Sequence, residues 1–408
     1  MTSAMSFEIF ERQTASGMVV RAAALMPPPP LQPAFRPDWQ DADWMARALQ
    51  LAALGLTTTT PNPRVGCVLV RDGQWLADGW HQRAGEGHAE VQALRALQAA
   101  GGDPRGATAY VTLEPCSHTG RTGPCCQALA VAGVHRVVVA MTDPNPQVAG
   151  RGLLALQAAG IAVTTGVGSA AAARLNAGFI SRMERGQPWV RLKVGMSLDG
   201  RTALGNGISQ WITGAAARLD VHRLRAEACA VLTGTGTLRA DDPQLDVRGL
   251  PVERQPLRVL IDATLSAPPA ARMLQGGAVV LAAAPLLAQT AVRRRADVLE
   301  GQGVQVIGVP ASGRYLDLAA ALQALGGLAI NDLLVEAGSR LNAALLAAGL
   351  VDECIFYLAP RLLGEQARGP AALGPFIELQ QAFALRFGEC CPIGADLRIQ
   401  AFPSHLPF

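Results

Sequence analysis

The chain contains few cysteines, few aromatic residues and no long uncharged apolar stretch. Its eight cysteines in 408 residues are too few and too irregularly spaced for a disulfide scaffold, so we expect free thiols that can bind a metal. No run of about 18 or more apolar residues lacks charges or turn formers, which argues against a transmembrane helix. Glu8, Glu11 and Arg12 precede any apolar run, a pattern that does not fit a secretory signal. We therefore expect a cytoplasmic protein without a membrane partner.

Charge of one sign is also scarce in any one place. Only 16% of the residues are charged, the net charge is +3, and basic runs are as short as the three arginines at 293–295. A nucleic-acid surface needs a basic stripe, commonly with aromatic stacking groups, but aromatic residues make up only 5% of the chain. We expect a small-molecule partner and no nucleic acid.

The length and the 50% apolar content predict at least two domains with substantial cores. Residues 1–37 form a proline-rich N-terminal extension that we expect to be disordered or dispensable, since proline blocks helix and sheet hydrogen bonds. A polar Gly- and Pro-containing stretch at 181–190 marks a boundary. The predicted domains are residues 38–184 and 185–408.

In the first domain, helical and strand patterns alternate. A helix is predicted over residues 41–55, a hairpin around the Asp-Gly turn that follows residues 65–70, and a second helix over residues 88–100. Further strands and helices follow in "ATAYVTLEP", "CCQALAVAG", "RVVVAM" and "GRGLLALQAAGIAV". This alternation predicts an α/β domain with a mostly parallel sheet covered on both faces.

A second α/β series begins after the boundary. Its strand-like stretches are "VRLKVGMSL", "ACAVLTGTG", "LRVLIDATL", "AVVLAAA", "VQVIGV", "DLLVEAG", "ECIFYLAPRLLG" and "ADLRIQAF". Helical patterns such as "GSRLNAALLAAGLV" lie between several of them. Since no repeat of 20–50 residues is present, we expect two unlike domains.

One group of residues in the first domain fits a catalytic zinc site. Such a site needs three protein ligands and one open position, which His88, Cys116 and either Cys125 or Cys126 can provide. The H-x-E spacing puts His88 and Glu90 in the first turn of one helix, where Glu90 can carry a proton without binding metal. We also expect Cys116 to end a strand at the point where the chain enters a helix, whose dipole stabilises a thiolate.

An H-x-E motif followed by Pro-Cys and a later cysteine is typical of zinc deaminases that act on cytosine or adenine rings. A closed structural zinc is the alternative, but it commonly uses four ligands in two close pairs such as C-x2-C, which are absent here. Cys116 and Cys125 are nine positions apart instead of three. We expect the longer loop between them to build part of a different substrate pocket.

The second domain lacks a dinucleotide-binding fingerprint, because "GTGTLR" at 234–239 ends in Arg where a third Gly belongs. A strand predicted over "ACAVLTGTGTL" ends in small residues instead, and Gly338 to Asn342 begin a helix that follows "DLLVEAG". Small residues and a helix N-terminus can bind a phosphate, but they are equally consistent with plain tight turns.

Both halves resemble a known family in the same order. "TTPNPRVGCVLVRDG", "GWHQRAGEGHAE", "YVTLEPCSHTGRTGPCC" and "DPNPQVAGRG" resemble the deaminase half of the bifunctional riboflavin-biosynthesis (RibD) family. "LKVGMSLDGRTA", "SQWIT", "GTGTLRADDP" and "VEAGSRL" resemble its reductase half. The resemblance implies a zinc-dependent, cytidine-deaminase-like three-layer domain followed by a dihydrofolate-reductase-like α/β domain.

For the deaminase half, the resemblance implies that His88, Cys116 and Cys125 bind Zn2+, that Glu90 carries the proton and that Cys126 is a packed thiol. The residues implied to line the pyrimidine and ribose pocket are Asn62, His81, His118 and Asn145, with Arg121 as a phosphate partner. A turn role is an equally good interpretation for Asn62 and Asn145.

For the reductase half, the resemblance implies NADPH as cofactor and association into a homo-oligomer through this domain. The implied NADPH contacts are Gly195, Trp211, Thr237, Asp241, Gly338, Ser339, Arg340, Leu341, Asn342, Ala343 and Ala344. The implied substrate contacts are Ser209, Arg225, Leu245, Arg248 and Glu336, with the two arginines as phosphate anchors. Lys193 and Asp199 are candidates for positioning the sugar or relaying a proton, and a buried ion pair is the alternative.

The implied activity is zinc-dependent deamination of 2,5-diamino-6-(5-phosphoribosylamino)pyrimidin-4-one, followed by NADPH-dependent reduction of its ribosyl group to ribityl. The product would be 5-amino-6-(5-phosphoribitylamino)uracil. The alternatives are a nucleic-acid or nucleoside deaminase with an appended binding module, or a chain in which one half is a degenerate scaffold.

Overall fold

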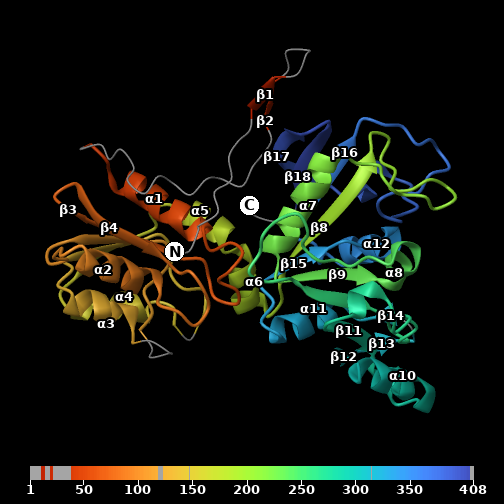
Figure 1. The fold of residues 1–408 in the computed structure, drawn as a ribbon, viewed down its shortest axis with the longest axis horizontal. Helices are drawn as coiled ribbons and strands as arrows, with labels where there is room; N and C mark the ends of the chain where they lie inside the picture. Colours follow the sequence, from red (N-terminus) through yellow and green to blue (C-terminus); the bar gives the residue numbers. More distant parts are fainter. Residues whose placement is uncertain are drawn as a thin grey trace. The chain divides into compact units, whose positions relative to one another are not determined.

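The computed structural model describes residues 38–117, 123–146, 148–313 and 315–404, and two short strands near the N-terminus (Figure 1). These two strands, β1 (Glu11–Gln13) and β2 (Val19–Arg21), pair antiparallel. The rest of the predicted extension over residues 1–37 lies outside the described residues. The remainder of the described chain forms two compact units that divide between Arg185 and Gly186. No described helix is both long and apolar enough to cross a bilayer.

The first unit is built on a five-stranded sheet in the order β4-β3-β5-β6-β7. The strands are β3 (Gly66–Arg71), β4 (Gln74–Trp80), β5 (Thr108–Val111), β6 (Arg136–Val139) and β7 (Ala162–Thr165). Asp72 and Gly73 both have positive φ, as the predicted hairpin turn between β3 and β4 requires. Strand β3 is antiparallel to both its neighbours, so only β5, β6 and β7 form the expected parallel part.

Six helices accompany this sheet in the described residues: α1 (Asp41–Ala53), α2 (Ala89–Ala99), α3 (Cys125–Val131), α4 (Arg151–Ala158), α5 (Ser169–Leu175) and α6 (Ala177–Arg185). Helices α2, α3 and α4 pack on one face through residues such as Ala93, Leu129 and Leu156. Helices α1 and α5 pack on the other through Trp44, Leu51 and Ala172. The unit therefore has the three layers expected for this half.

The second unit is built on a nine-stranded sheet in the order β12-β11-β10-β9-β15-β8-β16-β18-β17. Its strands are β8 (Trp189–Ser197), β9 (Ala230–Gly234), β10 (Leu257–Ile261), β11 (Ala278–Ala283), β12 (Val304–Val309), β15 (Asp332–Val335), β16 (Glu353–Ala359), β17 (Leu385–Ile393) and β18 (Asp396–Pro403). The strands from β12 to β16 run parallel, and β18 and β17 complete one edge antiparallel.

Helices cover both faces of the second sheet. Those described are α7 (Ala215–Glu227), α8 (Thr235–Asp241), α9 (Ala284–Leu287), α10 (Thr290–Glu300), α11 (Leu318–Gly327) and α12 (Ser339–Ala347). One core contains side chains of α7 and α10, and the other contains side chains of α11 and α12. A small ladder of β13 (Ala311–Ser312) and β14 (Tyr315–Leu316) and two 3-10 turns complete the unit.

In the second unit, α8 and β17 differ from the sequence-based expectation. The strand predicted to run through "GTGTL" ends at Gly234, and α8 begins at Thr235, because the small residues that end the strand also start a helical turn. Strand β17 was not predicted, since its residues are largely exposed and show no apolar alternation.

Candidate active sites

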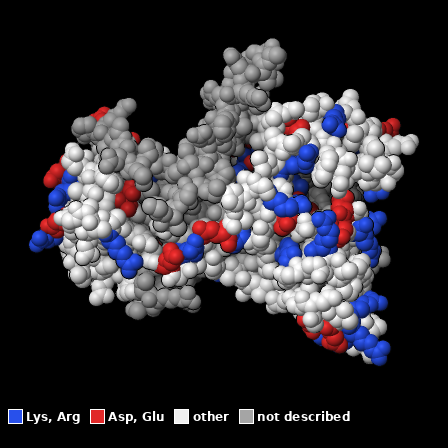
Figure 2. Space-filling view, in the orientation of Figure 1, with Lys and Arg blue, Asp and Glu red and all other residues white. Residues whose placement is uncertain are grey.

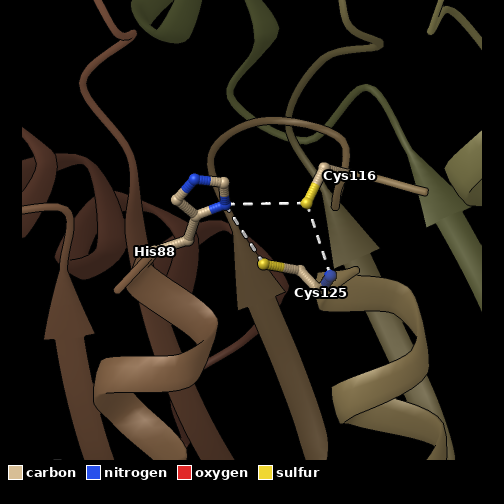
Figure 3. A group of neighbouring side chains, drawn as sticks. All are labelled: His88, Cys116 and Cys125. Carbon is tan, nitrogen blue, oxygen red and sulfur yellow. Dashed lines mark hydrogen bonds between the residues drawn. The ribbon is translucent and has the colours of Figure 1, made fainter. Parts of the chain in front are cut away.

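His88, Cys116 and Cys125 converge at one end of the first sheet (Figure 3). The Nδ1 atom of His88 lies 3.6 Å from Cys116 Sγ and 3.3 Å from Cys125 Sγ. His88 is the N-cap residue of α2, and Cys125 is the first residue of α3, so two helix starts place two of the three side chains. Among the described residues, this is the group of His, Cys, Asp and Glu side chains whose ligand atoms, all within 4.8 Å, could hold a metal.

The donor set and its spacing fit zinc. Ligand distances of about 2.3 Å to sulfur and about 2.1 Å to nitrogen, at a tetrahedral angle, place nitrogen and sulfur about 3.6 Å apart. The Cys125 thiol and the His88 ring favour the thiolate of Cys116 and lower its pKa, whereas the adjacent Cys116 sulfur raises the pKa of Cys125. A bound cation would stabilise both sulfurs as thiolates.

Cys116 occupies a different local structure from the one predicted. Strand β5 ends at Val111, and Cys116 lies five residues later in a segment without regular structure. The expected helix start is supplied by α3 across the intervening loop, because the backbone N–H of Cys125 donates to Cys116 Sγ at 3.3 Å. A helix start therefore stabilises the Cys116 thiolate as predicted, but this helix begins nine residues after Cys116.

Glu90 lies beside this triad. It is the second residue of α2, two residues after His88, and it is only 3% exposed. Burial raises the pKa of Glu90. A buried carboxyl group with a raised pKa is suited to taking up and releasing a proton near neutral pH.

The structure also brings Asn62 and His81 to the triad. The Nδ1–H of His81 donates to the Gly87 carbonyl at 3.3 Å, so its Nε2 accepts from the Asn62 side-chain amide at 3.0 Å. The His81 ring lies edge-on to the His88 ring, with centroids 5.3 Å apart. Burial lowers the pKa of His81, which keeps its ring neutral.

Asn145, another predicted deaminase residue, lies in a turn. The backbone N–H of Asn145 donates to Asp143 Oδ1 at 2.8 Å, and the Asn145 carbonyl accepts from Val148, as in a turn. His118 and Arg121 lie outside the described residues, so their predicted roles stay predictions.

The second unit contains a large pocket at the carboxyl ends of the parallel strands β8, β9, β10 and β15. This is where open α/β sheets bind ligands. On the face drawn in Figure 2, Lys and Arg side chains gather mainly on the second unit, with Asp and Glu side chains among them.

Nearly all the predicted reductase residues line this pocket. Among the expected NADPH contacts, the lining includes Gly195, Trp211, Thr237, Asp241, Gly338, Ser339, Arg340, Leu341, Asn342 and Ala344. The expected substrate contacts Ser209, Arg225, Leu245, Arg248 and Glu336 line it as well, as does Lys193. Ala343 is buried and is not brought to the pocket, and neither is Asp199, whose carboxylate accepts backbone N–H groups of Leu363 and Gly364.

A buried ion triad forms part of the pocket wall. Arg225 contacts Glu336 through Nε at 2.6 Å and Nη2 at 2.9 Å, and Lys193 Nζ lies 2.9 Å from Glu336 Oε2. Burial acts to raise the pKa of Glu336, but the two cations outweigh it and hold the pKa well below its usual range. Arg225 is therefore held inside the protein by Glu336. Arg248 pairs with Asp246 at 3.2 Å, but its side chain is 54% exposed, so it is the more open phosphate anchor.

Helix α7 also fixes the loop that carries Leu245 and Arg248. Arg225 Nη1 donates to the Asp246 carbonyl at 3.0 Å, and the Arg248 N–H donates to His222 Nδ1 at 3.1 Å. Leu245 adopts a positive φ of 54°, a conformation that costs a non-glycine residue energy and needs such support.

Sequence reasoning missed two residues of this helix. Arg218 stacks its guanidinium on the Trp211 ring, 4.6 Å from the centroid, and His222 lines the same pocket. Together with Arg225 they follow an i, i+4, i+7 helical stripe, which is the signal that could have found them.

Comparison with known proteins defines the class of each half. Residues 38–141 match the family described as the cytidine and deoxycytidylate deaminase zinc-binding region, and residues 188–399 match the RibD C-terminal domain. The chain therefore joins a zinc-binding deaminase domain to a reductase domain, and its second half is not a nucleic-acid-binding module.

Whole-chain relatives show the particular family. The Escherichia coli riboflavin biosynthesis protein RibD is 48% identical over 371 residues, covering 88% of this chain and 98% of that protein. The solved RibD structure from Acinetobacter baumannii is 43% identical with a TM-score of 0.80, covering 90% and 99%. A Thermotoga maritima structure, titled a diaminohydroxyphosphoribosylaminopyrimidine deaminase/5-amino-6-(5-phosphoribosylamino)uracil reductase, is 30% identical with a TM-score of 0.77, covering 89% and 98%.

The chain belongs to the RibD family. It is a bifunctional enzyme of riboflavin biosynthesis, with a zinc-dependent deaminase half and a reductase half.

Proposed function

We propose that the first unit deaminates 2,5-diamino-6-(5-phosphoribosylamino)pyrimidin-4-one and that the second reduces the deaminated product with NADPH to 5-amino-6-(5-phosphoribitylamino)uracil. The observation that carries the proposal is the convergence of His88, Cys116 and Cys125 beside the buried Glu90. The pocket at the strand ends of the second unit supports the reductive step.

In the deamination, water adds to ring carbon C2, which bears one of the amino groups. The bond between C2 and this amino nitrogen then breaks to release ammonia. Zinc at this site supplies a Lewis acid that makes water a stronger acid near neutral pH. Glu90 takes a proton from the attacking water at a carboxylate oxygen and gives it to the departing amine. Asn62 and His81, whose side chains fix each other, are proposed to orient the pyrimidine.

In the reduction, NADPH supplies a hydride to C1′ of the ribosyl group. Hydride addition needs an electrophilic carbon, so we propose that the ring-opened imine accepts the hydride at C1′ while its nitrogen takes up a proton from solvent. Arg248 binds the phosphate, and the triad of Lys193, Glu336 and Arg225 holds the sugar end of the pocket in place. Deuterium at C1′ after reaction with deuterated NADPH supports the imine, and no label at that carbon rules it out.

The second unit is also proposed to form the homo-oligomer contact. Within the described residues, strand β17 is the last hydrogen-bonded strand of its sheet, although β2 contacts it. Its Phe387 is 68% exposed, and Ile377 and Leu379 nearby in sequence are almost fully exposed. Uncovered edges and apolar patches of this kind are commonly buried against a partner.

The eight cysteines are all free, which supports a reducing, cytoplasmic location.

The test is a coupled assay on the zinc-loaded chain with the diaminopyrimidinone phosphate. Ammonia release that precedes NADPH oxidation, one for one, supports the proposal. Glu90→Gln should remove deamination and retain reduction, and Arg248→Ala should remove reduction and retain deamination. If neither ammonia release nor NADPH oxidation occurs with this substrate, the proposal fails.

A further inference from the structure

Glu114 is a buried carboxylate that the proposed chemistry does not use. It lies two residues before Cys116, and its side chain is 4% exposed. Its Oε2 accepts the backbone N–H groups of Asp143 at 3.1 Å and Gly150 at 2.9 Å, and its Oε1 accepts that of Gly152 at 2.8 Å. Three backbone amides thus satisfy one carboxylate.

These three amides lie at the two ends of one loop. The loop joins β6, which ends at Val139, to α4, which begins at Arg151. Asp143 lies near the start of the loop, whereas Gly150 and Gly152 lie at its end and in the first turn of α4. Glu114 therefore closes the loop, and the start of α4 favours an anion at this place because its first N–H groups have no partner within the helix.

A second contact ties this loop to the zinc ligands. A Cβ atom added to Gly152 would lie 2.0 Å from the Pro115 carbonyl oxygen, so the backbone preceding Cys116 lies directly against the first turn of α4. Inside the loop, Asp143 Oδ1 accepts the N–H of Asn145 at 2.8 Å. A chain of contacts thus leads from Cys116 through Glu114 and Asp143 to Asn145.

We infer that Glu114 is a positioning residue for deamination, which fixes the loop carrying Asn145 relative to the zinc ligand Cys116. The inference rests on the proposed function and on the predicted contact between Asn145 and the pyrimidine. Glu114 touches neither metal nor substrate in this scheme, so its loss changes substrate binding more than the chemical step.

The carboxylate cannot be replaced by its amide. Glutamine offers one acceptor oxygen and one NH2 group, which is a donor only. At least one of the three backbone N–H groups would then face another donor inside the protein, and one end of the loop would be released. Aspartate keeps both oxygens but is one methylene shorter, so Glu114→Asp should lie between the wild type and Glu114→Gln.

The experiment compares Glu114→Gln with Asp103→Asn, which makes the same chemical change at an exposed carboxylate of the same unit. We expect Glu114→Gln to raise the deaminase KM about tenfold with kcat within about twofold, and to retain zinc and NADPH-dependent reduction. Asp103→Asn should match the wild type. An unchanged KM, or a fall in kcat together with zinc content, overturns the inference in favour of no role or a purely structural one.

Hydrogen exchange on the wild-type chain tests the contact without any variant or substrate. The amides of Asp143, Gly150 and Gly152 should exchange slowly, although loops and first helical turns ordinarily exchange fast. Fast exchange at these amides overturns the inference, even if Glu114→Gln does not fold. If the wild type does not deaminate the pyrimidine, the proposed function fails, while slow exchange still establishes the Glu114 contact.

Discussion

Arg225 forms a two-pronged ion pair with Glu336, with Nε at 2.6 Å from one carboxylate oxygen and Nη2 at 2.9 Å from the other. We expect Glu336→Gln to leave two cations unpaired in the pocket wall and to lower the reductase kcat/KM by about thirtyfold, or about 2 kcal/mol. NADPH oxidation with the deaminated pyrimidine measures the effect. Glu353→Gln breaks a comparable buried pair with Arg191 outside the pocket, and should leave this kcat/KM near the wild-type value.

Glu90→Gln should remove deamination while retaining zinc. The amide keeps the shape of the side chain but cannot carry the proton, so we expect the deaminase kcat to fall by about a hundredfold or more. Ammonia release gives the rate, and metal analysis gives the zinc content. Glu86→Gln, at an exposed carboxylate four residues earlier, is the matched control and should not change either value. A Glu90→Gln chain that deaminates normally would contradict the assigned role.

The adjacent cysteines 125 and 126 should differ sharply in metal binding. The Cys125 sulfur lies 3.3 Å from His88 Nδ1, whereas Cys126 packs into the apolar core between the sheet and α3. We expect Cys125→Ser to lose most of its zinc and Cys126→Ala to keep it, because only Cys125 supplies a ligand atom. Elemental analysis after dialysis against a chelator decides this, and zinc loss from Cys126→Ala alone would reverse the assignment.

Asp220 should make the second unit sensitive to acid. Burial acts to raise its pKa, but Arg223 at 2.7 Å and the Tyr357 hydroxyl at 2.6 Å outweigh it and hold the pKa below its usual value. A folded-state pKa below the unfolded one gives stability that is complete above about pH 4 and lost as the pH falls through the lowered value.

Asp220→Asn should therefore lower the stability by about 2 kcal/mol at neutral pH and by much less in acid. Thermal unfolding across the pH range measures the difference. The control is Asp297→Asn, which breaks an exposed ion pair with Arg293 and should cost about 0–1 kcal/mol. Equal losses for Asp220→Asn at neutral and acid pH would refute the linkage.

The sequence was informative where one local pattern determines one structure. The sequence predicted the Asp72-Gly73 turn, the alternation of strands and helices, and the placement of His88 and Glu90 at the start of α2. These features could be predicted because turn chemistry and periodicity are local properties. The sequence pattern also predicted two of the three zinc ligands, His88 and Cys116. The choice of Cys125 over Cys126 as the third came from the family resemblance. That choice depends on which side of α3 faces the site.

The parts that could not be predicted depend on contacts between distant segments. Arg225 was expected to anchor a phosphate. The sequence around it does not show that its guanidinium pairs with the carboxylate of Glu336, more than a hundred residues later. The residues of β17 are largely exposed and show no apolar alternation, so the pairing of this strand with β18 has no periodic signal. In the sequence, Glu114 likewise looks like an ordinary residue at the end of a strand. Its role depends on contacts with the distant backbone N–H groups of Asp143, Gly150 and Gly152.

The close approach of α4 to the Pro115 carbonyl also limits how this enzyme can be altered. Since a methyl group at position 152 would overlap the Pro115 backbone oxygen, even alanine demands that α4 and the segment before Cys116 move apart. A saturation library selected for riboflavin-independent growth should therefore return glycine alone at this codon. The exposed Gly123, where an added Cβ atom has no described atom within 4 Å, should accept many replacements.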